Sequence, residues 1–453
     1  MRVYGSLFAA VLFTSAAACS ATSTQGLAKQ ELASVPALPN RDLDILFVVD
    51  SSGSMADEQR LLAVNFPRFM QQLERLPGGL PNVHIGVVTP DLGTLGGPSI
   101  GGCALMGNGG NLSLQDLTTI DGKPFFSNIG SANDPTVRTK NYSGELQAAF
   151  TQLASVGTNG CGLEQPLEAM KRALASDHAA NAGFLRDSAN LAVVIVTDED
   201  DCSATGPAFY SAHPELGPLN SYRCFHQGVV CDDDELDPQR PGARTNCRPR
   251  PNATYQTDVT SYIDFLIERK GDERKVMVAG VIAPTLSTVQ VEQRNFSAGL
   301  AAVLAASCER IFDSETSFAD PAIRLTSFLR GFPGRSQTSS ICDDDFSAVL
   351  STIGASTARL MNAACFEQAP LLDDNGNPDC EVVDISARSA TGTRTEQLLP
   401  ACGTTAREAC YRIVEDAALC GAQPSQLRLE VQRPQGASVA GYAVARCARA
   451  DSL

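Results

Sequence analysis

A carboxylate and two hydroxyls follow a strongly apolar run at alternate positions near the start of the chain. The run is LDILFVV (residues 43–49), and Asp50, Ser52 and Ser54 come directly after it. A nearly continuous apolar stretch of this length is typical of a strand buried on both faces, as in a parallel sheet. Oxygen ligands of this kind suit a hard divalent cation such as Mg²⁺, Mn²⁺ or Ca²⁺. The pattern therefore predicts a cation site at the end of this strand.

Two further segments carry side chains that can join such a site. Asp198 follows a second apolar run, LAVVIVT (residues 191–197), and Thr158 precedes a predicted helix. In an open α/β sheet, ligands bind beyond the carboxyl ends of the strands, where the strand order reverses. If the two apolar runs are neighbouring strands at that point, their terminal carboxylates converge. The predicted cation ligands are Asp50, Ser52, Ser54, Thr158 and Asp198.

Buried strands alternate with amphipathic helices over most of the chain, which predicts an α/β fold with a doubly wound, mostly parallel sheet. Strands are expected at residues 43–49, 83–89, 191–197 and 275–283. Apolar residues recur at helical spacing around residues 61–76 and at 147–156, 163–174, 257–269, 321–332 and 345–361. Two stretches interrupt the alternation, at about 90–141 and 202–251, and are expected to be surface insertions.

In the order and context of its candidate ligands, the chain resembles von Willebrand factor type A domains with their metal-ion-dependent adhesion site. That family has D-x-S-x-S after the first strand, a threonine before a later helix, and an aspartate that ends the fourth strand. The five candidate ligands match in that order, and the resemblance covers residues 42–362. It implies one divalent cation, with Mg²⁺ expected first, and an open coordination position. That position would take an acidic group of a protein ligand, or of a glycan.

The chain departs from the family's pattern directly after Asp198. Where the family has glycine, this chain has Glu199, followed by Asp200 and Asp201. These extra carboxylates could strengthen cation binding, or they could repel an acidic ligand. Alternatively, they point away and form a separate calcium site with the acidic run at residues 232–235. A solvated acidic loop is the simpler interpretation of that run.

The first 18 residues are typical of an export signal. A single arginine precedes a short apolar core at residues 7–13, which is too short to span a bilayer, and small residues lead to Cys19. This resembles the lipobox of bacterial lipoproteins, and ordinary cleavage before an incidental cysteine is the alternative. The resemblance implies a lipid-anchored protein of the bacterial cell envelope, with Ser20 favouring the outer membrane. Residues 19–41 are expected to be the lipidated cysteine and a flexible tether.

Fourteen cysteines remain after Cys19, an even number that fits disulfides formed in an oxidising compartment. They are distributed as two, four, two and six along the chain, so local pairing is expected, and connectivity within the four and the six stays open. Residues 363–453 hold the last six and predict a small, disulfide-stapled, β-rich domain. The candidates are Cys103, Cys161, Cys202, Cys224, Cys231, Cys247, Cys308, Cys342, Cys365, Cys380, Cys402, Cys410, Cys420 and Cys447.

Composition and missing motifs restrict the classes of function. With 51 Asp and Glu against 35 Lys and Arg, the chain lacks the basic excess that nucleic-acid binding requires. It has four histidines, none paired at metal-ligand spacing, and no G-x-S-x-G elbow for a serine nucleophile. We therefore expect a binding protein without catalytic activity. Two alternatives remain: a structural or assembly role in an envelope complex, in which the cation only stabilises the fold, and a metal-dependent hydrolase.

Overall fold

A computed structural model gives the conformation of most of the chain after the predicted signal peptide. It describes residues 29–36, 41–76, 79–131, 134, 136–233, 240–296, 299–312, 315–361, 365–366, 368–386, 395–403, 409–420, 424–432 and 441–448. Cys19 and the predicted signal peptide lie outside these ranges, so lipidation stays a prediction. Among the described helices, none is both long enough and apolar enough to cross a bilayer.

The main sheet has seven strands within the described residues. Their order is β15 (Ser336–Ser340), β10 (Val276–Ile282), β6 (Asn190–Val196), β2 (Asp42–Val49), β3 (Asn82–Val88), β4 (Phe126–Gly130) and β5 (Arg138–Lys140). The first five are parallel to one another, whereas β4 and β5 are antiparallel additions at one edge. The sheet is therefore mixed, with the predicted apolar runs forming its parallel centre.

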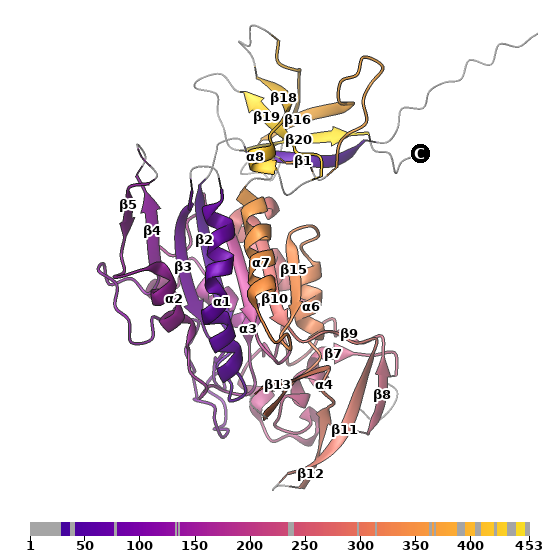
Figure 1. Ribbon diagram of the computed structural model, residues 1–453. Coiled ribbons are helices and arrows are strands. Elements are labelled where there is room, and N and C mark those ends of the chain that lie inside the picture. Colours follow the sequence, from indigo (N-terminus) through magenta and orange to yellow (C-terminus); the bar gives the residue numbers. More distant parts are fainter. Residues whose placement is uncertain are drawn as a thin grey trace, which may run out of the picture.

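Two groups of helices pack around the sheet. One group contains α1 (Ala56–Glu74), α2 (Leu146–Ala154) and α7 (Ser347–Met361), and α1 and α7 lie in front of the sheet in Figure 1. The other group contains α3 (Pro166–Ala173), α5 (Val259–Lys270) and α6 (Ile323–Arg330). Among the described residues, the helices of one group make no extensive contacts with the helices of the other group. Each helix buries an apolar stripe, which gives the predicted α/β alternation its core.

Aromatic packing joins the first helix group to the central strand. The ring of Phe47 on β2 meets the rings of Phe66, Phe69 and Phe150 edge-on, with centroids 4.9–6.1 Å apart. Such edge-to-face pairs add to the stabilisation that burial alone provides. This packing places the start of α1 directly beyond the end of β2, where the candidate ligands lie.

The expectation that residues from about 90 to 141 form a surface insertion is wrong in part. Strands β4 and β5 come from this region and extend the main sheet. The side chain of Arg138 fastens this edge, because it donates to the backbone carbonyls of Leu80, Pro81 and Asn128 at 2.6 Å. These strands are short and polar, so only their pairing partner makes them strands.

Several short elements surround the carboxyl ends of the parallel strands, at the bottom of Figure 1. The second insertion contains α4 (Tyr222–Gly228), β7 (Val229–Val230), β8 (Gly242–Thr245) and β9 (Arg248–Pro249). Two hairpins between β10 and α6 were not predicted: β11 (Thr288–Phe296) with β12 (Gly299–Leu304), and β13 (Cys308–Phe312) with β14 (Glu315–Ala319). Strand β8 pairs with β11, so the second insertion and the first hairpin form one small sheet.

The C-terminal region is rich in strands, as its composition predicts. A separate sheet has the order β1 (Gln30–Pro36), β20 (Gly441–Cys447), β16 (Cys380–Ser386) and β17 (Glu396–Leu399). A hairpin of β18 (Cys410–Glu415) and β19 (Leu427–Gln432) lies beside it with the short helix α8 (Ala417–Cys420). Strand β1 comes from the segment expected to be a flexible tether. That expectation is wrong for residues 30–36, because β20 supplies a partner from the other end of the chain.

All fourteen candidate cysteines form disulfides within the described residues, and the expected local pairing is confirmed. The pairs are Cys103–Cys161, Cys202–Cys224, Cys231–Cys247, Cys308–Cys342, Cys365–Cys420, Cys380–Cys447 and Cys402–Cys410. Each bridge closes a loop within one of the four groups of cysteines. Such loops stabilise the fold chiefly by restricting the unfolded chain.

A charge placed in β1 tests whether this segment is part of the folded C-terminal sheet. Ala33 is 5% exposed and belongs to the core of that sheet, whereas Glu31 on the same strand is exposed. We expect Ala33→Asp to reduce the free energy of unfolding by about 2 kcal/mol or more, because it buries an unpaired charge. Glu31→Gln should change it by less than about 0.5 kcal/mol. Urea denaturation measures both. Equal stability of the two variants would show that β1 is a tether and not part of the folded sheet.

Candidate metal site

The strand order reverses between β2 and β6, and both candidate aspartates lie there. From β2 the sheet continues to β3 on one side and to β6, β10 and β15 on the other. The predicted adjacency of the two apolar runs is therefore present, with Val49 opposite Val196. The backbone N–H of Asp50 continues this pairing and donates to the carbonyl of Val196 at 3.0 Å. Asp50 and Asp198 are 0% and 4% exposed, so both carboxylates sit in a largely dry crevice.

The loop after β2 turns its polar groups inward. One carboxylate oxygen of Asp50 accepts the backbone N–H of Ser52 at 2.7 Å, and the other accepts the hydroxyl of Thr197 at 2.5 Å. The hydroxyl oxygens of Ser52 and Ser54 lie 3.1 Å apart. Ser52 is buried and Ser54 is exposed, so this line of oxygens runs from the crevice to the surface. The arrangement offers one carboxylate and two hydroxyls to a cation.

The loop that carries Thr158 is held against the loop after β2 at two points. The side-chain amide of Gln59 on α1 donates to the carbonyls of Asp50 and Gly157 at 2.8 Å. The N–H of Gly160 donates to the carbonyl of Ser51 at 2.8 Å, and a Cβ at position 160 would overlap the Ser51 side chain. Thr158 itself is half-buried, and its hydroxyl makes no hydrogen bond to any described residue. The structure thus brings its loop to the site without engaging its side chain.

Burial and mutual repulsion shape the electrostatics of the two aspartates. Burial and the neighbouring Asp50 together raise the pKa of Asp198 to about 8, although a hydrogen bond with Ser54 opposes the shift. Burial also raises the pKa of Asp50, against the hydrogen bonds from Thr197 and Ser52. The Oδ1 atom of Asp198 is buried without a hydrogen-bond partner. Two buried carboxylates this close are costly when both are ionised, unless a positive charge joins them.

Glu164 is a buried acid that the sequence analysis missed. It precedes α3, is 0% exposed, and has no hydrogen-bond partner on either carboxylate oxygen. Burial raises its pKa well above the usual value, and Asp50 contributes most among its charged neighbours. In the sequence, a glutamate just before a helix and a proline indicates only a favourable charge at a helix N-terminus. Its burial beside Asp50 depends on how the loop folds back onto the sheet.

The three acids after Asp198 divide into two groups. Glu199 is close to Asp198 and Asp320, and burial together with these two carboxylates raises its pKa. Asp200 accepts the backbone N–H groups of Arg324 and Leu325 at the start of α6, at 2.9 and 3.0 Å. Its carboxylate therefore compensates the positive end of that helix.

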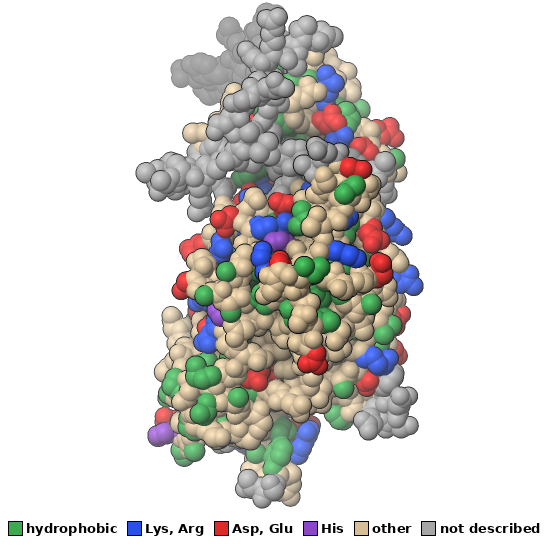
Figure 2. Space-filling model, turned by 90° about the vertical axis from the view of Figure 1, so that its left-hand side faces the viewer, with side chains coloured by type: hydrophobic (Ala, Val, Ile, Leu, Met, Phe, Trp, Pro, Cys, Tyr) green, Lys and Arg blue, Asp and Glu red, His purple; other side chains and the backbone are tan. Residues whose placement is uncertain are grey.

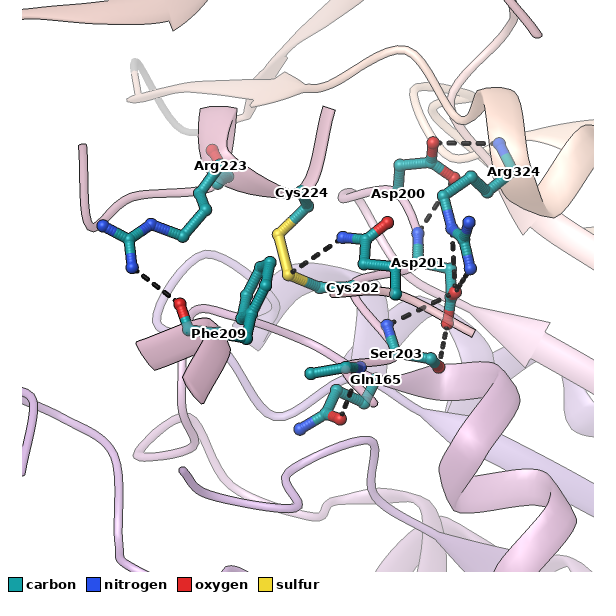
Figure 3. The surroundings of a disulfide bond; sticks show 12 residues. Gln165, Asp200, Asp201, Cys202, Ser203, Phe209, Arg223, Cys224 and Arg324 are labelled. Carbon is teal, nitrogen blue, oxygen red and sulfur yellow. Dashed lines mark hydrogen bonds and ion pairs between the residues drawn. A yellow bond between two sulfur atoms is a disulfide. The ribbon is translucent and has the colours of Figure 1, made fainter. Parts of the chain in front are cut away.

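Asp201 forms an ion pair with Arg324, and both side chains are completely buried. The closest nitrogen–oxygen distance is 2.9 Å (Figure 3). Asp201 also accepts the Leu167 N–H at 3.1 Å and the Ser203 hydroxyl at 2.6 Å, so it joins the starts of α3 and α6. In the acidic run at residues 232–235, for which the sequence predicts a solvated loop with a calcium site as the alternative, Asp232 pairs with Arg248. Asp234 and Glu235 lie outside the described residues. Asp200 and Asp201 thus have structural partners of their own.

The donor set of the crevice fits a divalent cation. The described residues contain no group of three or more His, Cys, Asp or Glu side chains already arranged around a metal position. A site here would combine the carboxylates of Asp50 and Asp198 with the hydroxyls of Ser52 and Ser54. The unpaired Oδ1 of Asp198 and the raised pKa values of both aspartates are what a bound cation would relieve.

No protein family and no curated protein matches the sequence. Three similar solved structures are proximal thread matrix protein 1 from the mussel byssus (10% identity, TM-score 0.26), von Willebrand factor type A from Catenulispora acidiphila (12%, 0.27) and the human COPII-coat protein Sec24c (9%, 0.31). The alignments cover 70%, 94% and 91% of this chain, and 46%, 67% and 40% of those chains. The chain thus spans less than half of the mussel and human structures. TM-scores of this size carry no argument, so the fold description rests on the strand order and pairing given above.

Removing the carboxylate of Asp201 should strongly destabilise the fold. Asp201→Ala leaves Arg324 buried without its partner, and such a change costs about 3–5 kcal/mol. The matched control is Asp232→Ala, whose ion pair with Arg248 is about half exposed on both sides and should be worth less than about 1 kcal/mol. Denaturant unfolding measures both. Similar losses for the two variants would show that the buried pair does not hold α3 and α6 together.

In EDTA, the free energy of unfolding should fall as pH rises from about 4 to about 8. The folded pKa of Asp198 is about 8 and its usual value is 3.8, so between these the unfolded chain has released a proton that the folded chain retains. One such group contributes a slope of at most about −1.4 kcal/mol per pH unit. Asp198→Asn removes this contribution and should flatten the profile. Identical pH slopes for the wild type and the variant, measured by urea unfolding, would contradict the shift.

Proposed function

We propose that the chain binds a protein ligand through a divalent cation held by Asp50, Ser52, Ser54 and Asp198. The observation that carries the proposal is the unpaired, buried Oδ1 of Asp198 beside the buried carboxylate of Asp50, at the reversal of strand order. Mg²⁺ is the first expectation, and Mn²⁺ or Ca²⁺ would fit the same oxygen ligands. Hydroxyls in place of further carboxylates would leave the cation electrophilic. An acidic group of the ligand would then complete its coordination.

The surroundings of the crevice support a protein ligand. The β13–β14 hairpin is tied to the start of α1, because Arg310 and Glu58 form a buried ion pair at 2.7 Å. Its outer face exposes Ile311 and Phe318, which are 73% and 56% accessible. Exposed apolar side chains thus lie on a hairpin that contacts the start of α1, the helix that follows Ser54. Apolar groups next to a charged anchor are common features of protein-binding surfaces.

The proposed function is binding without catalysis. His84 lies on β3, where its ring nitrogen bonds the carbonyl of Phe184 at 2.8 Å, and the ring of His226 bonds the carbonyl of Glu215. Neither is placed to activate Ser52 or Ser54 as a nucleophile. Nucleic acid is not proposed as a ligand, since the net charge is −16. On the face shown in Figure 2, basic and acidic side chains are interspersed among the coloured residues.

A purely stabilising cation is the second candidate. The complete burial of Asp50 favours it, since a cation could relieve the repulsion there without reaching any partner. For either candidate, the proposal places the chain in a bacterial cell envelope with a lipid at Cys19, preferably in the outer membrane. Seven disulfides among the described residues support an oxidising compartment, and the lipid itself stays a prediction.

Thermal unfolding in EDTA and in Mg²⁺, Mn²⁺ or Ca²⁺ tests the cation site. A ligand of the native state at 100 times its dissociation constant adds about 2.7 kcal/mol, which is a measurable rise in Tm. We expect the rise in the wild type and in Asp232→Ala, and its loss in Asp50→Ala. A rise that survives in Asp50→Ala but vanishes in Asp232→Ala would place the cation in the second insertion and overturn the proposal.

Peptides that carry Asp or Glu separate the two candidate functions. If the cation recruits a ligand, such peptides should bind the wild type in the presence of the cation, and EDTA or Asp50→Ala should abolish the binding. If the cation only stabilises the fold, Asp50→Ala should lower the Tm measured with cation, and no peptide in the panel should bind.

A further inference from the structure

Glu164 is a buried acid whose side chain lies beside another acid, Asp50. It is 0% exposed, and both of its carboxylate oxygens lack a hydrogen-bond partner. Its neighbour Gln165 is equally buried but fully engaged: its amide donates to the hydroxyl of Tyr210 at 2.7 Å and accepts the N–H of Ala204 at 3.1 Å. Buried polar groups are almost always paired, so an unpaired buried carboxylate indicates a missing partner.

The backbone around Glu164 is fastened to the ends of three central strands. The Gly160 N–H donates to Ser51 after β2, and the Gln165 N–H donates to Pro90 after β3 at 3.1 Å. The carbonyl of Glu164 accepts the Cys202 N–H beyond β6 at 2.8 Å. The disulfide Cys103–Cys161 closes the same loop on its other side. Glu164 is therefore held at the reversal of strand order by fixed backbone contacts.

The charged groups that act most strongly on Glu164 are negative. They are Asp50, Glu199 and Asp91. Other buried acids of this chain have an arginine: Asp201 has Arg324 and Glu58 has Arg310. Among the described residues, no Lys or Arg forms an ion pair with Glu164, Asp50 or Asp198. The side chains that the structure describes therefore supply no positive charge in contact with these three acids.

We propose that Glu164 is the third carboxylate ligand of the cation, in the role that the sequence analysis gave to the Thr158 hydroxyl. This inference rests on the proposed cation site. In the cation-free arrangement Glu164 lies beside Asp50, and the three carboxylates are not gathered around one metal position. Binding would draw the Glu164 side chain toward the cation by rotation, while its backbone stays fixed. A third carboxylate raises cation affinity, because affinity in oxygen sites increases with ligand charge.

Glu164→Gln and Thr158→Ala separate the two ligand assignments in the full-length mature chain. Isothermal titration with Mg²⁺ and with Mn²⁺ gives the dissociation constants, and thermal unfolding in EDTA gives the stability without cation. We expect Glu164→Gln to raise the dissociation constant at least tenfold and Thr158→Ala to change it less than threefold. In EDTA, Glu164→Gln should leave the Tm close to the wild-type value, because the amide can donate to the Asp50 carboxylate as the protonated acid does. A merely structural glutamate would lower the Tm both with and without cation.

The outcomes distinguish this inference from the proposed function. If Asp50→Ala loses cation binding while Glu164→Gln keeps the wild-type dissociation constant, Glu164 is not a ligand and the cation site remains. If Thr158→Ala is the more severe of the two variants, the original assignment to threonine holds and this inference is overturned. If the wild type itself binds no divalent cation, the proposed function and the inference both fail.

Discussion

The structure depends on one electrostatic constraint: two parallel strands end side by side in aspartates that water hardly reaches. Asp50 and Asp198 are buried because β2 and β6 are central strands, covered on both faces and joined along their length. Buried carboxylates in a medium of low polarity either take up protons or bind a positive charge. The serine hydroxyls that turn inward and the loop that Gln59 holds both surround this concentration of negative charge.

The buried acids outside the crevice differ from Asp50 and Asp198 in their partners. Asp44 at the opposite end of β2 is bonded to Arg186 at 2.8 Å, and Glu58 and Asp201 have their own arginines. These three acids are thus each paired with an arginine, whereas Asp200 is held by backbone N–H groups. At the carboxyl ends of β2 and β6 the fold supplies hydroxyls and further acids instead. This difference supports the proposed cation site over a purely structural contact between loops.

Disulfides and hairpins provide the rigidity that such a crevice requires. Cys103–Cys161 closes the loop that carries Thr158 and Glu164, and Cys202–Cys224 closes the segment directly after Asp201 (Figure 3). Both restrict loops whose backbone groups bond the strand ends. At the far end of the sheet, the strand β1 joins the C-terminal sheet, so the first and last described segments are paired with each other. The loops of the candidate site are thus held by covalent bridges, and the region away from it is closed by strand pairing.

Continuous apolar runs determined the central strands by themselves, because a strand covered on both faces has apolar side chains at nearly every position. Local spacing likewise determined most helices, the aspartates at the strand ends and the even partition of cysteines. Tertiary structure alone decided elements whose stability comes from distant partners. Strand β1 needs β20, β4 and β5 need the edge of β3, and β11 is paired with β8 from the second insertion as well as with β12. It also decided the roles of the acids: Asp201 became structural because Arg324 reaches it from 123 residues away in the sequence. Glu164 entered the candidate site because its loop folds onto three strand ends, and no local pattern of residues contains that information.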